Sequence, residues 1–172
     1  NRLVDPSISS NEKEELKKKN GISGKSIFCQ IPTMRFPHSY PVDFMHAVCI
    51  NVNKRMWALW SHNFVLEKEG EPIPEFVLSS QKIESIGKEM KNARQFIPGI
   101  FGRPPRDISK NWAGFKAEEW KNWCIYYSIP LLHGRLPDKY LVMWARFVEV
   151  VKLCMKHKIM QTDLNTIEKN IK

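Results

Sequence analysis

The stretch YPVDFMHAVCINVNKRMWALW, residues 40–60, decides how the rest of the chain is interpreted, because it alone combines a clear helical period with polar residues in an apolar setting. Pro41 supplies a backbone angle that suits the first turn of a helix. Apolar residues then recur at steps of three and four: Met45, Val48, Val52, Met56 and Leu59. This spacing predicts an amphipathic helix with one buried side.

Asp43 and His46 are the polar pair at the start of this stretch. A carboxylate is favoured in the first turn of a helix by the macrodipole, and residues three apart share a face. One interpretation is an N-terminal charge beside a hydrogen-bonded core histidine. The other is a functional pair, with a perturbed pKa or a bound metal ion. Spacing alone leaves both open.

Composition indicates a globular domain with a basic surface. The chain has 172 residues, 42% of them hydrophobic, with six Trp and nine Phe, which is enough to bury a real core. Its net charge of +9 favours an acidic partner such as nucleic acid, although lysine-rich surfaces also serve solubility alone. No apolar run approaches the roughly 20 residues that cross a bilayer, so we expect an intracellular protein without a membrane partner.

The four cysteines, Cys29, Cys49, Cys124 and Cys154, are far apart and form no zinc-binding motif. We expect them to be reduced and buried as small apolar side chains. The first residue is Asn1 rather than Met, and the chain ends within a lysine-rich, helix-like stretch. Both features predict a piece of a longer protein.

Periodicity elsewhere predicts a mainly helical chain. We expect at least four helices, centred near residues 50, 88, 121 and 148, and at most one brief strand, at 27–30. The second helix is expected to begin after an N-cap at Ser79 or Ser80. Trp120, Trp123 and Tyr127 lie on one bulky face of the third helix, and a buried core is favoured over a stacking platform for bases.

Six basic residues are candidate phosphate contacts. Three follow the polar face of the second helix: Lys88, Lys91 and Arg94. The other three lie in PGIFGRPPRDISK, residues 98–110, which its prolines and glycines predict to be a constrained loop: Arg103, Arg106 and Lys110. Such a loop suits phosphate contact, and a solvated turn packed by Ile100 and Phe101 explains it equally well.

The order of these motifs resembles one family. PxDxMH at residues 41–46, GRxP beginning at Gly102 and AEEWKNW at 117–123 stand in the order found in transposases of the CACTA (En/Spm-like) superfamily. The likeness runs from about Gly21 to Lys156. It implies a mainly α chain in which a helical insertion region is attached to the edge of an RNase H-like α/β catalytic core. The implied segments are 1–20, a polar edge or linker; 21–60, part of the core; 61–78, a connection; and 79–172, the helical insertion.

The resemblance also implies a function and partners. The implied protein is a DDE-type transposase, which cuts and joins DNA with two Mg²⁺ ions held by carboxylates. It would act in the nucleus on transposon ends. A homo-oligomer is also possible on this resemblance. The chain departs from the pattern because no strand-borne Asp or late catalytic Glu is found, so we expect the segment alone to be inactive. Asp43 is then either a metal ligand or a residue that orients the site with His46. The alternative is a noncatalytic transposon-derived helical domain that binds DNA or protein.

Overall fold

The computed structural model describes residues 6–21, 24, 26–35, 38–40, 42–61, 72–102 and 104–172, with only the backbone of Phe101. The chain divides into two compact units, Asn1–Val42 and Asp43–Lys172. Within these described residues the secondary structure is helical and no strand occurs, which confirms the mainly α prediction. The attachment to an RNase H-like core stays a prediction.

The first unit holds α1, Ser10–Asn20, and a 3-10 helix, Ile27–Gln30. The Ser9 hydroxyl accepts a hydrogen bond from the Glu12 N–H, and Gly21, with φ of 63°, ends the helix. No residue of α1 is buried. Residues 27–30, where at most one brief strand was expected, form a 3-10 helix: the Ser26 hydroxyl caps this segment by accepting from the Phe28 N–H, which closes a helical turn.

The second unit begins with the predicted helix of residues 40–60. A π-helix, Met45–Val52, continues into α2, Asn53–Trp60. Asn53 stands at the junction, where its buried side-chain amide donates to the carbonyls of Cys49 (2.8 Å) and Trp120 (3.4 Å). This amide therefore ties the change of helical register to the neighbouring helix. The apolar period predicted the helix but not its wider π-helical turns.

Helix α3, Ser80–Ala93, starts as predicted, because the Ser79 hydroxyl accepts from the Lys82 N–H. It continues as a 3-10 turn, Arg94–Phe96, and a second 3-10 turn, Gly99–Phe101, follows. Residues 98–110 are not wholly irregular, since they include the 3-10 turn Gly99–Phe101 and most of α4, Ile108–Asn111. A further 3-10 turn, Trp112–Gly114, follows α4. Asp107 caps α4 by accepting from the Ser109 N–H at 2.9 Å.

The third predicted helix is one rod of three pieces: α5, Ala117–Asn122; a π-helix, Trp123–Tyr127; and α6, Ser128–Leu132. Pro130 lies within α6 and cannot donate the backbone hydrogen bond of its turn, which accounts for a change of register just before it. Helix α7, Asp138–Cys154, and α8, Gln161–Ile171, complete the unit and pack against each other.

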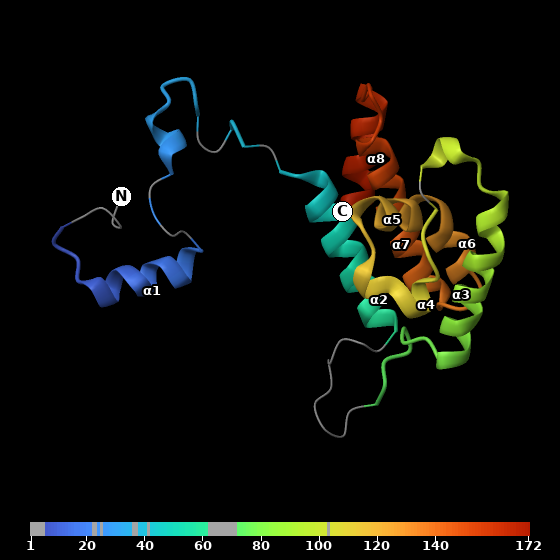
Figure 1. Ribbon diagram of the computed structural model, residues 1–172. Helices are drawn as coiled ribbons and strands as arrows, with labels where there is room; N and C mark the ends of the chain where they lie inside the picture. Colours follow the sequence, from blue (N-terminus) through green and yellow to red (C-terminus); the bar gives the residue numbers. More distant parts are fainter. Residues whose placement is uncertain are drawn as a thin grey trace. The chain divides into compact units, whose positions relative to one another are not determined.

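The core lies between these helices. Figure 1 shows the Met45–Trp60 segment on one side of the unit and α3 on the other, with α5, α6 and α7 between them. Trp57 meets Trp123 edge to face at 5.3 Å, and Trp60 meets Trp144 at 5.0 Å. Trp120 lies in the same buried cluster. The aromatic face of the third helix is thus core, as predicted.

The predicted segments 1–20, 21–60, 61–78 and 79–172 stay a prediction, whereas the cysteines differ from expectation in part. Residues 43–60 pack against α5, in the same unit as the region 79–172 that was expected to be an insertion. Cys49 and Cys124 are buried, and burial is the main reason that the pKa of the Cys124 thiol rises to about 12. Cys29 and Cys154 are exposed, so their predicted burial is wrong. Among the described helices none is long and apolar enough to span a membrane.

Gly87 allows α4 to pack against α3. A β-carbon at this position would lie 2.1 Å from Asp107 Oδ1 and 2.5 Å from Ser109 Oγ, inside the capping group of α4. Gly87→Ala gains about 1 kcal/mol in helix propensity. It must also displace the cap, and overpacking costs about 1 to 3 kcal/mol. We expect net destabilisation, measured as a lower denaturant midpoint.

Gly99→Ala is the matched control, because nothing lies within 4 Å of its added β-carbon. Its effect is expected to stay within about 0.5 kcal/mol. A midpoint for Gly87→Ala at or above that of the unchanged protein would show that the cap moves aside without cost.

Candidate nucleic-acid interface

Asp43 and His46 lie together at the start of the Met45–Trp60 helix, on the surface. Asp43 Oδ1 accepts from the His46 backbone N–H at 3.1 Å, and Asp43 Oδ2 lies 2.5 Å from His46 Nδ1. Their side chains are 59% and 71% exposed, respectively. These two hydrogen bonds hold the pKa of Asp43 below its usual value, and the bond to the His46 side chain has the larger effect. The pair is a helix cap at the surface, and His46 is not a core histidine.

This arrangement does not fit a magnesium site. Both oxygens of Asp43 already accept hydrogen bonds from His46. Two-metal phosphoryl transfer needs several converging carboxylates. In the part of the chain that the structure describes, no three His, Cys, Asp or Glu side chains gather where they could hold a metal ion. The assignment of Asp43 as a metal ligand stays a prediction.

Lys88, Lys91 and Arg94, named the basic stripe below, are exposed on α3 and its 3-10 extension. Their spacing of three brings each side chain next to the following one. The neighbouring Glu89 does not neutralise them, because its carboxylate pairs with Arg135. None of the three cations has an ion-pair partner among the described residues, although the exposed Glu84 lies one turn before Lys88.

Lys110 is carried to the same part of the unit by α4. The contact of Asp107 and Ser109 with Gly87 fixes α4 on α3, and Lys110 follows Ser109 directly. Lys91 lies one helical turn beyond Gly87 on the same face. Lys110 is exposed like the basic stripe. Helices α3 and α4, which pack against each other, thereby both carry exposed cations.

Arg106 is engaged inside the fold. Its Nε donates to Glu119 Oε1 at 2.7 Å, one Nη2 bond reaches Glu119 Oε2 at 2.9 Å and another reaches the Gly114 carbonyl at 2.6 Å. Glu119 is 1% exposed. Contact of Arg106 with phosphate was predicted from its loop and stays untested, but this guanidinium already serves a buried carboxylate. Arg103, the sixth predicted residue, lies outside the described residues.

The electrostatics of Glu119 follow from this pairing. Burial by itself raises the pKa of Glu119. Hydrogen bonds from the Arg106 side chain and from the backbone N–H groups of Lys116 and Arg106 outweigh it, so the pKa lies below its usual value. Glu119 also accepts from the N–H of Lys116, just before α5, at 3.0 Å. The Glu119 carboxylate thus caps α5 through Lys116 and also holds the preceding loop through Arg106.

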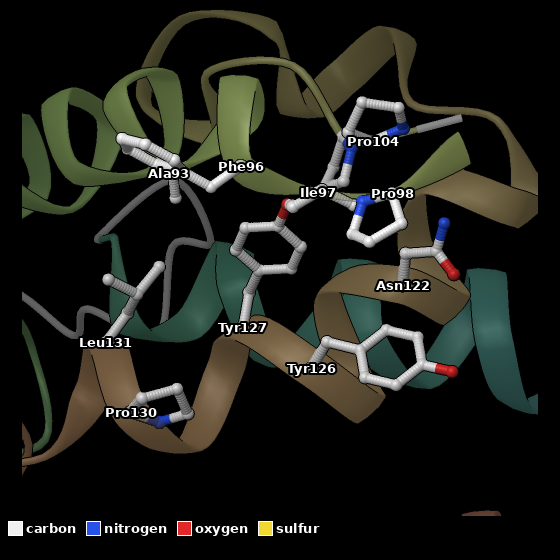
Figure 2. A pocket seen from close by; sticks show the side chains of 11 residues that line it. Ala93, Phe96, Ile97, Pro98, Pro104, Asn122, Tyr126, Tyr127, Pro130 and Leu131 are labelled. Carbon is white, nitrogen blue, oxygen red and sulfur yellow. The ribbon is translucent and has the colours of Figure 1, made fainter. Parts of the chain in front are cut away.

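An apolar cavity of about 420 Å³ lies beside the basic stripe, and the sequence did not predict it. Figure 2 shows its lining from three segments: the end of α3, the proline-containing loop that follows, and the π-helix with α6. Pro98, Pro104, Pro105 and Pro130 contribute to its walls together with Phe96 and Tyr126. The signal in the sequence was this recurrence of proline near aromatic residues, which periodicity does not detect.

Comparison of the chain with protein-family models, with curated proteins and with solved structures found no match. The class of protein therefore rests on the fold and the surface: a helical unit that carries exposed cations on two packed helices.

Proposed function

We propose that residues 43–172 are a DNA-binding helical domain of a cut-and-paste DNA transposase. The observation that carries the DNA-binding part is the basic stripe with Lys110, presented by two helices that Gly87 locks together. Unpaired, exposed cations on a rigid surface match the regular negative charge of a phosphate backbone. The transposase part rests on the ordered motifs that resemble the CACTA superfamily.

In the proposed transposase, the chemistry belongs to carboxylates of an RNase H-like core that hold Mg²⁺, in the nucleus. The described residues offer no such cluster, so this domain would position DNA rather than cut it. The capping role of Asp43 favours the second candidate, a noncatalytic transposon-derived domain that binds DNA. Both candidates share the DNA-binding surface, and neither fixes the oligomeric state.

The test is a titration of the chain with duplex DNA at two salt concentrations. We expect binding that weakens as salt rises, because each phosphate neutralised by a cation releases a counterion. Replacing Lys88 and Lys91 together with Gln is expected to weaken binding to all sequences alike. It should also reduce the slope of log affinity against log salt by about 2.

A matched control removes the same charge elsewhere. Lys158 and Lys169 are exposed, one before α8 and one within it, and have no ion-pair partner among the described residues. The double Gln variant at these positions should bind duplex DNA almost as the unchanged chain does. Equal losses in both double variants would mean that only net charge matters. Binding that ignores salt would remove the proposal altogether.

A further inference from the structure

The cavity beside the basic stripe contains an unsatisfied polar group. Tyr127 is 8% exposed, and its hydroxyl is buried without a hydrogen-bond partner among the described residues. Figure 2 shows the Tyr127 ring in the middle of the lining, with the hydroxyl directed toward Ile97 and Pro98. A buried hydroxyl without a partner is costly, and a ligand that supplies one recovers that cost.

The walls of the cavity suit a flat ring. Phe96 lines the cavity and is 78% exposed, so its ring offers an open aromatic surface to a ligand, and Tyr126, which is 49% exposed, also contributes to the lining. Prolines from the loop and from α6 complete the apolar wall. The volume of about 420 Å³ lies within the range of roughly 300 to 1,000 Å³ that is usual for small-molecule sites.

A cation stands close to this opening. Arg94, the last member of the basic stripe, follows Ala93 of the lining by one residue. Burial raises the pKa of the Tyr127 hydroxyl, and the positive charge of Arg94 opposes this with a smaller effect. The hydroxyl therefore stays protonated at neutral pH and can both donate and accept. Arg94 can meet an anion with paired N–H donors.

We propose that this cavity binds one unpaired nucleotide, with its base among Phe96, Tyr126 and the prolines, its edge at the Tyr127 hydroxyl, and its phosphate at Arg94. A nucleotide has a flat aromatic base, a polar base edge and an attached phosphate, which match the aromatic wall, the Tyr127 hydroxyl and Arg94, respectively. Stacking on aromatic side chains beside a basic groove is how proteins hold single-stranded nucleic acid. The inference deepens the proposed DNA binding by adding a site for an unstacked base.

The experiment measures binding of the whole chain to four probes: deoxyadenosine, deoxyadenosine 5′-monophosphate, a single-stranded oligo-dA of about ten nucleotides, and a duplex. Chemical shifts in the NMR spectrum report the cavity, and fluorescence anisotropy reports affinity. The monophosphate is expected to shift signals of Phe96 and Tyr127. The oligonucleotide should bind more tightly than the monophosphate, which would identify a base within a strand as the physiological occupant. Binding of the monophosphate alone would identify a free nucleotide, with the same cavity chemistry.

Three variants separate the parts of the site. Phe96→Ala should weaken single-strand binding about tenfold by removing a stacking surface. Tyr127→Phe keeps the ring and should weaken it about fivefold by removing the hydroxyl. Arg94→Gln should abolish the preference for the monophosphate over deoxyadenosine. Met143→Ala is the control, because Met143 is 67% exposed and lines a different apolar cavity.

The outcomes distinguish this inference from the proposed function. If Phe96→Ala and Tyr127→Phe stay folded and bind the oligonucleotide unchanged, the nucleotide site is wrong, whereas the duplex titration on Lys88 and Lys91 is unaffected. If a proline-rich peptide shifts the cavity signals and the nucleotide does not, the site belongs to a protein partner and the inference also fails. If the unchanged chain binds the oligonucleotide but not the duplex, the proposed duplex-binding function is wrong and the nucleotide site is still supported.

Discussion

Replacing Arg106 with Met is expected to destabilise the helical unit strongly, because the change leaves the Glu119 carboxylate buried without its counter-ion. Stranding a buried charge in this way costs about 3 to 5 kcal/mol. The measurement is the free energy of unfolding from denaturant titration. Glu119→Gln in the same chain should recover part of the loss, because it removes the stranded charge and keeps a side chain of similar size.

The pH dependence of this variant has a defined sign. In the unchanged protein the pKa of Glu119 is lowered, so its stabilisation is present above the ordinary carboxyl pKa and is lost as pH falls through the lowered value. Without Arg106, burial dominates and raises the pKa of Glu119. The difference in stability between the two proteins should therefore shrink as pH falls from neutral into the acidic range. A difference that is constant with pH would contradict the ion-pair explanation.

An exposed ion pair provides the control for Arg106→Met. Lys139 pairs with Glu75, and their side chains are 62% and 55% exposed. Pairs in this setting contribute little, because water and salt screen them and the side chains lose freedom. Lys139→Met is therefore expected to change the midpoint only slightly. A large effect there would mean that removal of any cation, rather than burial of Glu119, explains the loss.

The role of Arg106 shows where the sequence was insufficient. Its loop placed it beside Arg103 and Lys110 as an expected phosphate contact, and nothing local distinguished the three. Glu119 lies within the motif AEEWKNW, residues 117–123, where nothing in the local sequence indicates a partner in the preceding loop. The pairing joins residues 13 apart along the chain and depends on how the loop returns to α5. Local patterns do not contain that information.

Helix positions were predictable because their causes are local. The Ser79 cap and the three- and four-residue apolar period of α3 are visible in the sequence, and the structure confirms both. The π-helical turns were not predictable, since they depend on packing of Asn53 against the next helix and on where Pro130 falls. The cavity was missed for the same reason: its walls come from three separate segments.

Trp123→Ala is the other large effect we expect. The Trp123 indole is fully buried and meets Trp57 edge to face at 5.3 Å, so truncation removes contacts between the π-helix and α2 at once. Loss of a buried Trp side chain costs about 3 to 5 kcal/mol, through lost burial and the cavity that remains. The free energy of unfolding is the measurement. Trp112→Ala is the control, because this indole is only partly buried and should cost clearly less.

The pair of indoles allows a sharper test than either variant alone. In a double-mutant cycle of Trp57→Ala and Trp123→Ala, the coupling energy is expected to be about 0.5 to 1.5 kcal/mol beyond burial, as for edge-to-face rings. Trp57→Ala with Trp112→Ala should show smaller coupling, since in the part of the chain that the structure describes the Trp57 ring meets that of Trp123 and not that of Trp112. Strictly additive effects for Trp57 and Trp123 would show that the two indoles are buried independently. Helix α2 and the π-helix Trp123–Tyr127 would then not depend on each other through this contact.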